Sequence, residues 1–290
     1  MADEALRYPA PHPLRLPLKL WRAVGARVMR EAERDHLALI AAGVAFFGLL
    51  ALFPGLASLV ALYRLLGDPN DIGAQMAILR GIAPGPMLDL LHEQLLRLMR
   101  APAAALATQG VLATVLAFWA SQQGVRSLLR GLNIAYGGLA RRGIVRRTAL
   151  GVWFSLAALA LAALLIATFS LTPATMVGLG VPVWFAFSFL QWPLLAASIV
   201  GFALALYRWG PNRRAPGWVW LTPGALLAAV LWLLASWLFT LYAQAFAGYG
   251  QIYGSLAGVV LLLLWLFVSA FAILLGAELN AELEKCCIAD

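Results

Sequence analysis

Charged residues are absent from a long stretch near the end of this sequence. Between Ala215 and Ala277 there is no Lys, Arg, Asp or Glu, and the first charge after that run is Glu278. Such a run is typical of membrane-embedded helices, because charged side chains are costly in hydrocarbon. As one helix it would be roughly 95 Å long, about three times the roughly 30 Å thickness of the hydrocarbon core. We therefore expect two helices, with the turn at residues 247–251, where glycines and a glutamine interrupt the apolar run.

Lysine, histidine and cysteine are also scarce, and each scarcity excludes a kind of chemistry. The only lysines are Lys19 and Lys285, and neither follows a glycine, so a Walker A phosphate-binding loop is absent. The three histidines lie far apart and form no zinc-binding spacing with cysteine, and no Gly-x-Ser-x-Gly motif occurs. Cys286 and Cys287 are adjacent, which predicts free thiols. We therefore expect no enzymatic activity, no metal and no cofactor.

The overall composition agrees with a membrane location. Hydrophobic residues make up 63% of the chain and charged residues only 12%, against roughly 25% in soluble domains. The net charge of +8 comes from basic residues that flank the apolar runs, a pattern that favours membrane orientation over nucleic-acid binding. We therefore expect an integral membrane protein with membrane lipids as partners and no nucleic-acid partner.

Six apolar segments approach the roughly 20 residues that a membrane-spanning helix needs. Because their number is even, both termini lie on one side of the membrane. Seven basic residues precede the first segment and six connect the second to the third, whereas four lie on the opposite side. The six apolar segments predict an all-α, polytopic membrane helical bundle, and the positive-inside rule places both termini in the cytoplasm. The segments are 37–63, 103–123, 149–170, 182–206, 222–246 and 252–277.

The same pattern predicts the domain organisation. Residues 1–36 form a cytoplasmic or interfacial segment, 37–284 form a single transmembrane domain, and 285–290 form a cytoplasmic tail. Basic and apolar residues mix along 14–34, which is typical of an amphipathic elbow helix on the inner leaflet. Leucines at helical spacing between prolines predict a short helical hairpin in the external loop 67–102.

A polar stripe follows the second apolar segment. Gln122, Arg126, Arg130 and Asn133 are spaced by four, four and three residues, so we expect them on one helical face at the cytoplasmic side. One interpretation is a vestibule for an anionic group, because guanidinium groups suit phosphate. The alternative is that the arginines follow the positive-inside rule and extend to the lipid headgroups.

Acidic and amide residues follow the sixth segment. Glu278 and Asn280 lie at its cytoplasmic end, where Arg126 and Arg130 also emerge, so we expect Glu278 to pair with one of these arginines. Such a pair could latch the helices together or form part of a substrate site, and both readings stay open. All carboxylates lie outside the six segments or at their ends, which argues against an ion-coupled pump.

Prolines, an amide and small residues mark further positions inside the segments. Pro54 and Pro193 each remove a helical hydrogen bond and are candidate hinges. Gln191 lies near the middle of the fourth segment, where an amide should face protein or a wet cavity. Small residues four apart allow helices to approach closely and predict packing within the chain, as in Gly224-xxx-Ala228 and Ala272-xxx-Gly276.

Three motifs carry a family resemblance. They are Ala41-Ala42-Gly43-Val44-Ala45-Phe46-Phe47 with Leu52-Phe53-Pro54, the run from Ser127 to Gly137 containing Arg130-Gly131-Leu132-Asn133, and Tyr253-Gly254-Ser255-Leu256-Ala257 through Trp265 to Gly276-Ala277-Glu278-Leu279-Asn280. Together they resemble the YihY/BrkB family of bacterial inner-membrane proteins over most of residues 30–285. Phe47 departs from the pattern, because the family often has tyrosine near this position.

The resemblance implies a six-helix inner-membrane protein. It links the chain to serum resistance in virulence and, for one branch, to transport of a lipopolysaccharide precursor lipid. An older family label, ribonuclease BN, is not supported here, because the clustered His and Asp ligands of a metal-dependent ribonuclease are absent.

Two hypotheses follow from these patterns. The first is a transporter or flippase for an amphiphilic, anionic lipid-like substrate, which the family resemblance implies to be of the envelope class. The second is a non-transporting scaffold or assembly factor whose polar residues only hold helices together. The oligomeric state is left open. The candidate substrate-binding residues are Gln122, Arg126, Arg130, Asn133, Gln191, Glu278 and Asn280.

Overall fold

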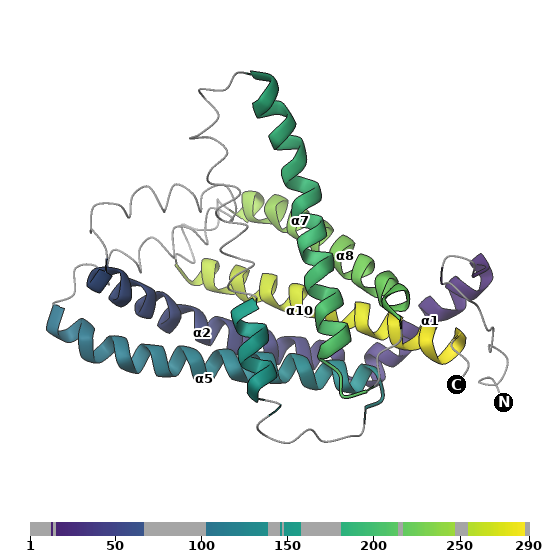
Figure 1. Ribbon diagram of the computed structural model, residues 1–290, viewed down its shortest axis with the longest axis horizontal. Coiled ribbons are helices and arrows are strands. Elements are labelled where there is room, and N and C mark those ends of the chain that lie inside the picture. The colour runs from purple at the N-terminus through teal and green to yellow at the C-terminus, as the bar shows by residue number, and fades with distance from the viewer. Residues whose placement is uncertain are drawn as a thin grey trace.

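The protein is built from helices, as its composition predicts (Figure 1). The computed structural model describes residues 16–66, 103–138, 148–157, 181–213, 217–246 and 255–287, together with Pro13 and Arg146, and these residues contain no strand. A short helix, Thr148–Ala157, lies between α5 and α7. The long helices are α1 (Leu18–Arg34), α2 (Leu37–Leu66), α5 (Ala103–Ala135), α7 (Val181–Trp209), α8 (Trp218–Phe246) and α10 (Ser255–Cys287).

Three stretches of the described helices are long and apolar enough to cross a membrane, namely Leu37–Gly55, Trp218–Tyr242 and Gly258–Cys287. They correspond to the first, fifth and sixth predicted segments. The all-α class and the membrane character are therefore confirmed, whereas the count of six crossings stays a prediction. The predicted external hairpin in 67–102 and the predicted turn at 247–251 lie outside the described residues.

Two helices extend about three turns beyond the apolar segments that predicted them. The α5 helix continues from the second segment to Ala135, and α10 continues past the sixth to Cys287, so the first residues of the predicted tail are helical. The difference has a physical reason: hydropathy marks where a helix leaves hydrocarbon, whereas these helices continue because their polar ends pack against protein.

The α10 helix is the centre of the bundle. It packs against α8, α2, α1 and α5, and Figure 1 shows α2 and α5 side by side next to it. The core lies where these helices meet, and α2, α5, α7, α8 and α10 each contribute a leucine with no exposed surface. These are Leu37, Leu132, Leu206, Leu221 and Leu274. Between helices in lipid, this close packing contributes van der Waals attraction in place of a hydrophobic driving force.

The outward faces of the helices are apolar. On α8 the side chains of Val230, Trp237 and Leu238 are exposed, and Phe118 and Trp119 are exposed on α5. A soluble monomer rarely exposes such large contiguous apolar surface, so these faces fit contact with hydrocarbon.

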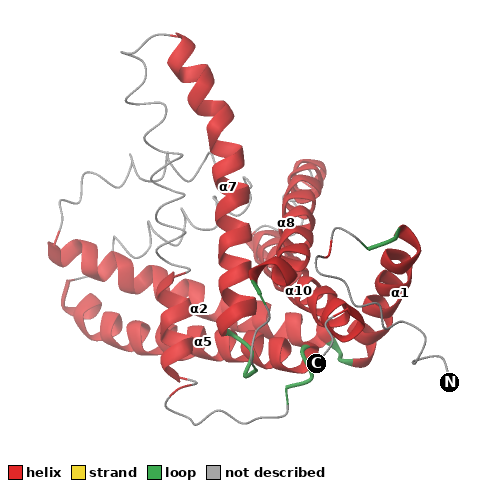
Figure 2. Ribbon diagram, turned by 45° about the vertical axis from the view of Figure 1, so that its right-hand side comes forward, coloured by secondary structure: helices red, strands yellow, loops and turns green. Residues whose placement is uncertain are grey.

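The first helix packs on the last. Leu20, Val24, Val28 and Ala32 recur every four residues on α1 and are buried, and most of this stripe packs against the C-terminal end of α10. Figure 2 shows α1 beside that end. The helix is amphipathic as predicted, but α10 covers its apolar face, and its predicted place on the membrane surface stays untested.

The joint between α1 and α2 is a tight turn. The N–H of Asp35 donates to the Glu31 carbonyl, and His36 follows in the left-handed region with φ at 52°. A left-handed conformation is unfavourable for a residue with a side chain, by roughly 1 kcal/mol or more. The packing around the joint therefore has to hold His36 in this conformation.

Candidate functional site

Buried polar groups without partners occur between α5 and the helix Thr148–Ala157. Gln122 on α5 is only 3% exposed, and neither its amide nitrogen nor its amide oxygen has a hydrogen-bond partner. Gly151 lies opposite, and a Cβ built there would overlap the Gln122 amide oxygen. Because buried amides are almost always hydrogen-bonded, an unpartnered one needs an explanation, of which an absent ligand is one.

Arg126 lies one helical turn from Gln122 on the same seam. One of its terminal nitrogens donates to Thr148 Oγ1 at 3.3 Å, whereas its Nε is buried and has no partner. A contact of 3.3 Å between Ser121 Oγ and Ser155 Oγ extends the polar seam by another turn. The side chains of Gln122 and Arg126 therefore keep unused hydrogen-bond donors at a helix–helix contact.

The rest of the predicted stripe points elsewhere. Arg130 is exposed, and Asn133 is occupied by contacts within the protein. The Asn133 amide nitrogen donates to the Leu129 carbonyl at 2.7 Å, and its Oδ1 accepts from the Asn212 N–H at 2.7 Å. The structure thus brings together two of the four predicted residues in the seam with Thr148–Ala157.

Asn280 connects α10 to α8. It has no exposed surface; its Oδ1 accepts from the Gly224 N–H at 2.8 Å, and its Nδ2 donates to the Leu221 carbonyl at 3.0 Å. Both backbone groups flank Pro223, which lacks an N–H and disturbs the regular helical pattern. The Asn280 amide therefore satisfies the backbone of a neighbouring helix where a proline weakens it.

We expect Asn280→Asp to destabilise the protein by about 1 to 3 kcal/mol, because the Leu221 carbonyl loses its donor and a charge is buried. The measurement is chemical unfolding in detergent, followed by circular dichroism. Asn133→Asp is the matched control: it keeps the acceptor for Asn212 and loses only the bond to Leu129, so its effect should be below about 1 kcal/mol. Equal stability of the two variants would contradict this role of Asn280.

The backbones of α8 and α10 cross at two glycines close to Asn280. A Cβ on Gly224 would overlap the Gly276 carbonyl oxygen, and a Cβ on Gly276 would overlap the Gly224 carbonyl and the Tyr207 hydroxyl. Tyr207 of α7 is fully buried and donates to the Ile273 carbonyl at 2.7 Å. The predicted close packing of these small residues within the chain is therefore confirmed.

Glu278 is not paired with an arginine, contrary to the sequence-based expectation. It is fully buried and neither carboxylate oxygen has a hydrogen-bond partner, while Arg126 donates to Thr148 and Arg130 is exposed. The reason is helical geometry, because two residues separate Glu278 from Asn280 by about 200° around the helix. Asn280 faces α8, so Glu278 points to another side of α10.

An ion pair that the sequence did not predict holds the same end of the bundle. Both terminal nitrogens of Arg213, in the connection between α7 and α8, donate to the Glu284 carboxylate of α10, one of them at 2.8 Å. The Arg213 guanidinium also stacks on the Tyr136 ring, 3.8 Å from its centroid. The only signal for this pair was the position of Glu284, one turn after Asn280 on the same face of α10.

The remaining predicted positions stay untested. The backbone of α7 is described at Gln191, but its side chain lies outside the described part of the chain. The α2 helix continues through Pro54 and α7 through Pro193, and Ser58 Oγ donates to the Pro54 carbonyl at 2.8 Å. Their role as hinges therefore stays a prediction.

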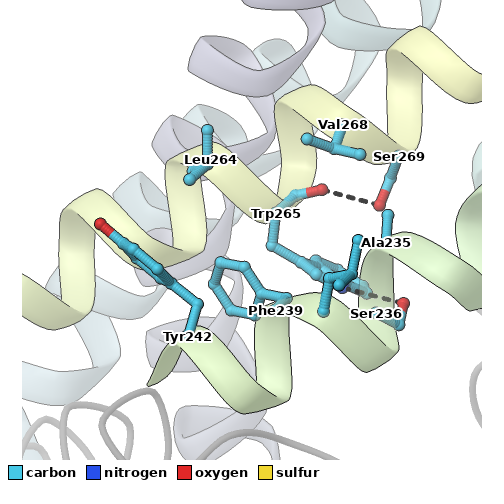
Figure 3. Close-up of a pocket in the computed structure, with 9 residues that line it drawn as sticks. Ala235, Ser236, Phe239, Tyr242, Leu264, Trp265, Val268 and Ser269 are labelled. Atoms are coloured by element: carbon cyan, nitrogen blue, oxygen red, sulfur yellow. Dashed lines mark hydrogen bonds between the residues drawn. The ribbon is translucent and has the colours of Figure 1, made fainter. Parts of the chain in front are cut away.

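A groove of about 300 Å³ lies between α8 and α10 (Figure 3). The Phe239, Tyr242, Leu264 and Trp265 side chains form much of its lining. Its few polar groups are already in use: Ser269 Oγ donates to the Trp265 carbonyl at 2.7 Å, and the Trp265 indole N–H donates to Ser236 Oγ at 3.4 Å. The groove therefore offers an apolar surface with its hydrogen bonds satisfied.

Across the described ranges, no group of three or more His, Cys, Asp or Glu side chains is placed to hold a metal ion. Cys286 and Cys287 are free thiols that pack against α1.

Comparison with known proteins gives one family. The sequence model of the family described as virulence factor BrkB matches residues 28–289. The chain is 30% identical to the putative ribonuclease-like protein YfkH of Bacillus subtilis, over 84% of this chain and 89% of that protein. It is 35% identical to a UPF0761 membrane protein of Idiomarina loihiensis over 34% of each chain, and 43% identical to one of Pseudoalteromonas translucida over 29% of this chain and 27% of that protein. No solved structure matches.

Proposed function

Because this chain belongs to the virulence factor BrkB family, which includes proteins named as membrane proteins, we propose that it moves an amphiphilic anionic lipid across the bacterial inner membrane. The substrate is of the envelope-lipid class that the family resemblance implies. The proposal includes six crossings, both termini in the cytoplasm and no enzymatic step.

The observation that carries the proposal is the pair of unused donors on α5. Gln122 Nε2 and Arg126 Nε are buried without partners on adjacent turns of one seam. A buried donor that lacks an acceptor costs about 1 to 3 kcal/mol, and a charged one costs more. A phosphate group supplies several acceptor oxygens at once and suits a guanidinium group. An anionic headgroup in the seam would therefore satisfy both side chains.

The groove between α8 and α10 supports a lipid as the substrate. Its lining residues lie within Trp218–Tyr242 and Gly258–Cys287, which are two of the candidate membrane spans. Its volume is at the lower end of the range for ligand pockets, and its lining is almost entirely apolar. Within these candidate spans the surrounding solvent would be hydrocarbon. The occupant that fits the groove best is therefore an acyl chain of a lipid.

We expect Gln122→Leu and Arg126→Gln each to slow lipid movement about tenfold, because a hydrogen bond to a charged group contributes about 1.5 kcal/mol or more. The assay follows fluorescent phosphatidylglycerol across the bilayer of liposomes that contain the purified protein. Gln122→Leu should also leave the free energy of unfolding unchanged or raise it, since an unsatisfied buried amide is removed. This combination separates a binding role from a structural one.

Arg130→Gln is the matched control, because Arg130 is exposed on the same helix. It should leave the rate of lipid movement within about twofold of the unchanged protein. Rates that fall equally in all three variants would contradict a specific site at Gln122 and Arg126.

The second candidate function is a scaffold that transports nothing. It is favoured by polar side chains that already have partners within the protein. Asn280 bonds to the backbone of α8, and Arg213 is paired with Glu284. The liposome assay separates the two functions. No acceleration over empty vesicles, across several anionic and neutral lipids, would overturn transport and leave the scaffold.

A further inference from the structure

Glu278 differs from the other buried acids near the end of α10. Glu282 is bound by Lys285 at 2.6 Å, and Glu284 is bound by Arg213, whereas both oxygens of Glu278 lack a partner. Glu278 also has no exposed surface. An ionised carboxylate without water or a partner is far more costly than a neutral acid, so this arrangement fits a Glu278 that carries a proton.

The groups around Glu278 add to this preference. Its electrostatic neighbours are Glu31 of α1, Asp35 of the joint between α1 and α2, and Glu282 and Lys285 of its own helix. Three acids thus surround it with one lysine, and that lysine already contacts Glu282. These net negative surroundings disfavour a negative charge on Glu278 and favour a bound cation.

Asp35 provides a connection to water. It interacts electrostatically with Glu278 and is itself partly exposed at the joint before α2. Burial raises the pKa of the Asp35 carboxyl above its usual value, and the neighbouring Glu31 raises it further. Asp35 is therefore an acid in the electrostatic surroundings of Glu278 that water can reach.

Protonation of Glu278 is also linked to the position of α1. The apolar stripe of α1 packs on the same end of α10, through Val24 and Val28 against Leu279 and Leu283. If Glu278 loses its proton, the charge needs water, and water reaches it when α1 separates from α10. The bend at His36 is the joint about which α1 would turn.

We propose that Glu278 binds the proton that couples the proton gradient across the membrane to movement of the substrate, through docking of α1 on α10. This inference rests on the proposed transport of an anionic lipid and names its energy source. It also revises the expectation that carboxylates at the segment ends argue against ion coupling, because the structure buries one of them completely.

The proton on Glu278 is tested by infrared spectroscopy of the full-length protein in lipid. We expect the unchanged protein at neutral pH to show the carbonyl stretch of a protonated carboxylic acid, and Glu278→Gln to lose it. Glu33→Gln is the matched control, because Glu33 is exposed on α1, and it should leave the band in place. A band that persists in Glu278→Gln, or is absent from the unchanged protein, would overturn the proposal.

Coupling is tested in liposomes that carry fluorescent phosphatidylglycerol and a pH difference of one unit. For one proton exchanged per lipid, this difference is equivalent to a shift of about tenfold in the distribution of the lipid between leaflets. We expect the unchanged protein to produce a shift of that order. Glu278→Gln should move the lipid without any shift, and Asp35→Asn should reach the same distribution as the unchanged protein more slowly.

The two proposals fail in different ways. No lipid movement by the unchanged protein, with or without a gradient, would overturn the proposed function and with it the coupling. Lipid movement whose final distribution ignores the gradient would overturn the coupling alone and leave the proposed function intact.

Discussion

Gly276→Ala is expected to destabilise the protein by about 3 kcal/mol or more. The added Cβ would overlap the Gly224 carbonyl of α8 and the Tyr207 hydroxyl of α7, and it would lie 3.1 Å from the Ala228 Cβ. Backbone cannot rotate aside as a flexible side chain does, so α8 and α10 must separate along their crossing. The Asn280 hydrogen bonds to α8 should then lengthen, which makes the loss larger than that of ordinary overpacking.

The measurement is chemical unfolding in detergent, with the helical signal as the readout. Gly43→Ala is the matched control, because Gly43 lies in α2 with no atom within 4 Å of its built Cβ. This control should be neutral or stabilising by up to about 1 kcal/mol, since alanine favours a helix over glycine. A Gly276→Ala protein as stable as the Gly43→Ala protein would show that α8 and α10 do not cross at this point.

Arg213→Ala is expected to lower the free energy of unfolding by about 3 to 5 kcal/mol. Arg213 and Glu284 are 16% and 17% exposed, so removal of the arginine leaves a largely buried carboxylate without its partner. The Tyr136 ring also loses the guanidinium that stacks on it. Arg213→Lys should lose less stability than Arg213→Ala but more than none, because an ammonium group cannot make the bidentate contact with the Glu284 carboxylate.

A double-mutant cycle measures the pair itself. The double variant Arg213→Ala with Glu284→Gln should lose clearly less free energy of unfolding than the sum of the two single variants. The second change removes the carboxylate charge that the first leaves unpaired. Arg34→Gln is the control for a surface pair: its contact with Glu31 is 3.6 Å and Arg34 is 79% exposed, so the change should be below about 1 kcal/mol. Additive losses at Arg213 and Glu284 would refute the coupling.

Hydropathy and spacing predict the helices and their closest crossing. The uncharged run that ends at Ala277 indicates α8 and α10, and the small residues at Gly224 and Gly276 indicate that these helices touch within the chain. Both are local signals, since a glycine permits close approach whichever helix arrives. They predict that a contact forms, and the structure adds which backbone atoms form it.

The polar contacts at the C-terminal end of α10 are less predictable, because they depend on rotation about a helix axis. Glu278, Asn280 and Glu284 lie within seven residues of one helix, yet they meet different neighbours. Assigning Glu278 to an arginine required knowing which face of α10 meets α5. Charge and proximity to the membrane boundary do not contain that information.

The central position of α10 also bears on how the protein is made. Of the described helices it is the last to leave the ribosome, yet α1, α2, α5 and α8 all pack against it. The contact faces of the helices that emerge earlier stay uncovered until α10 is made. These faces include Gly224 of α8 and the apolar stripe of α1. Assembly of this bundle is therefore a late event in synthesis, and its uncovered faces are open to misassembly until α10 has inserted.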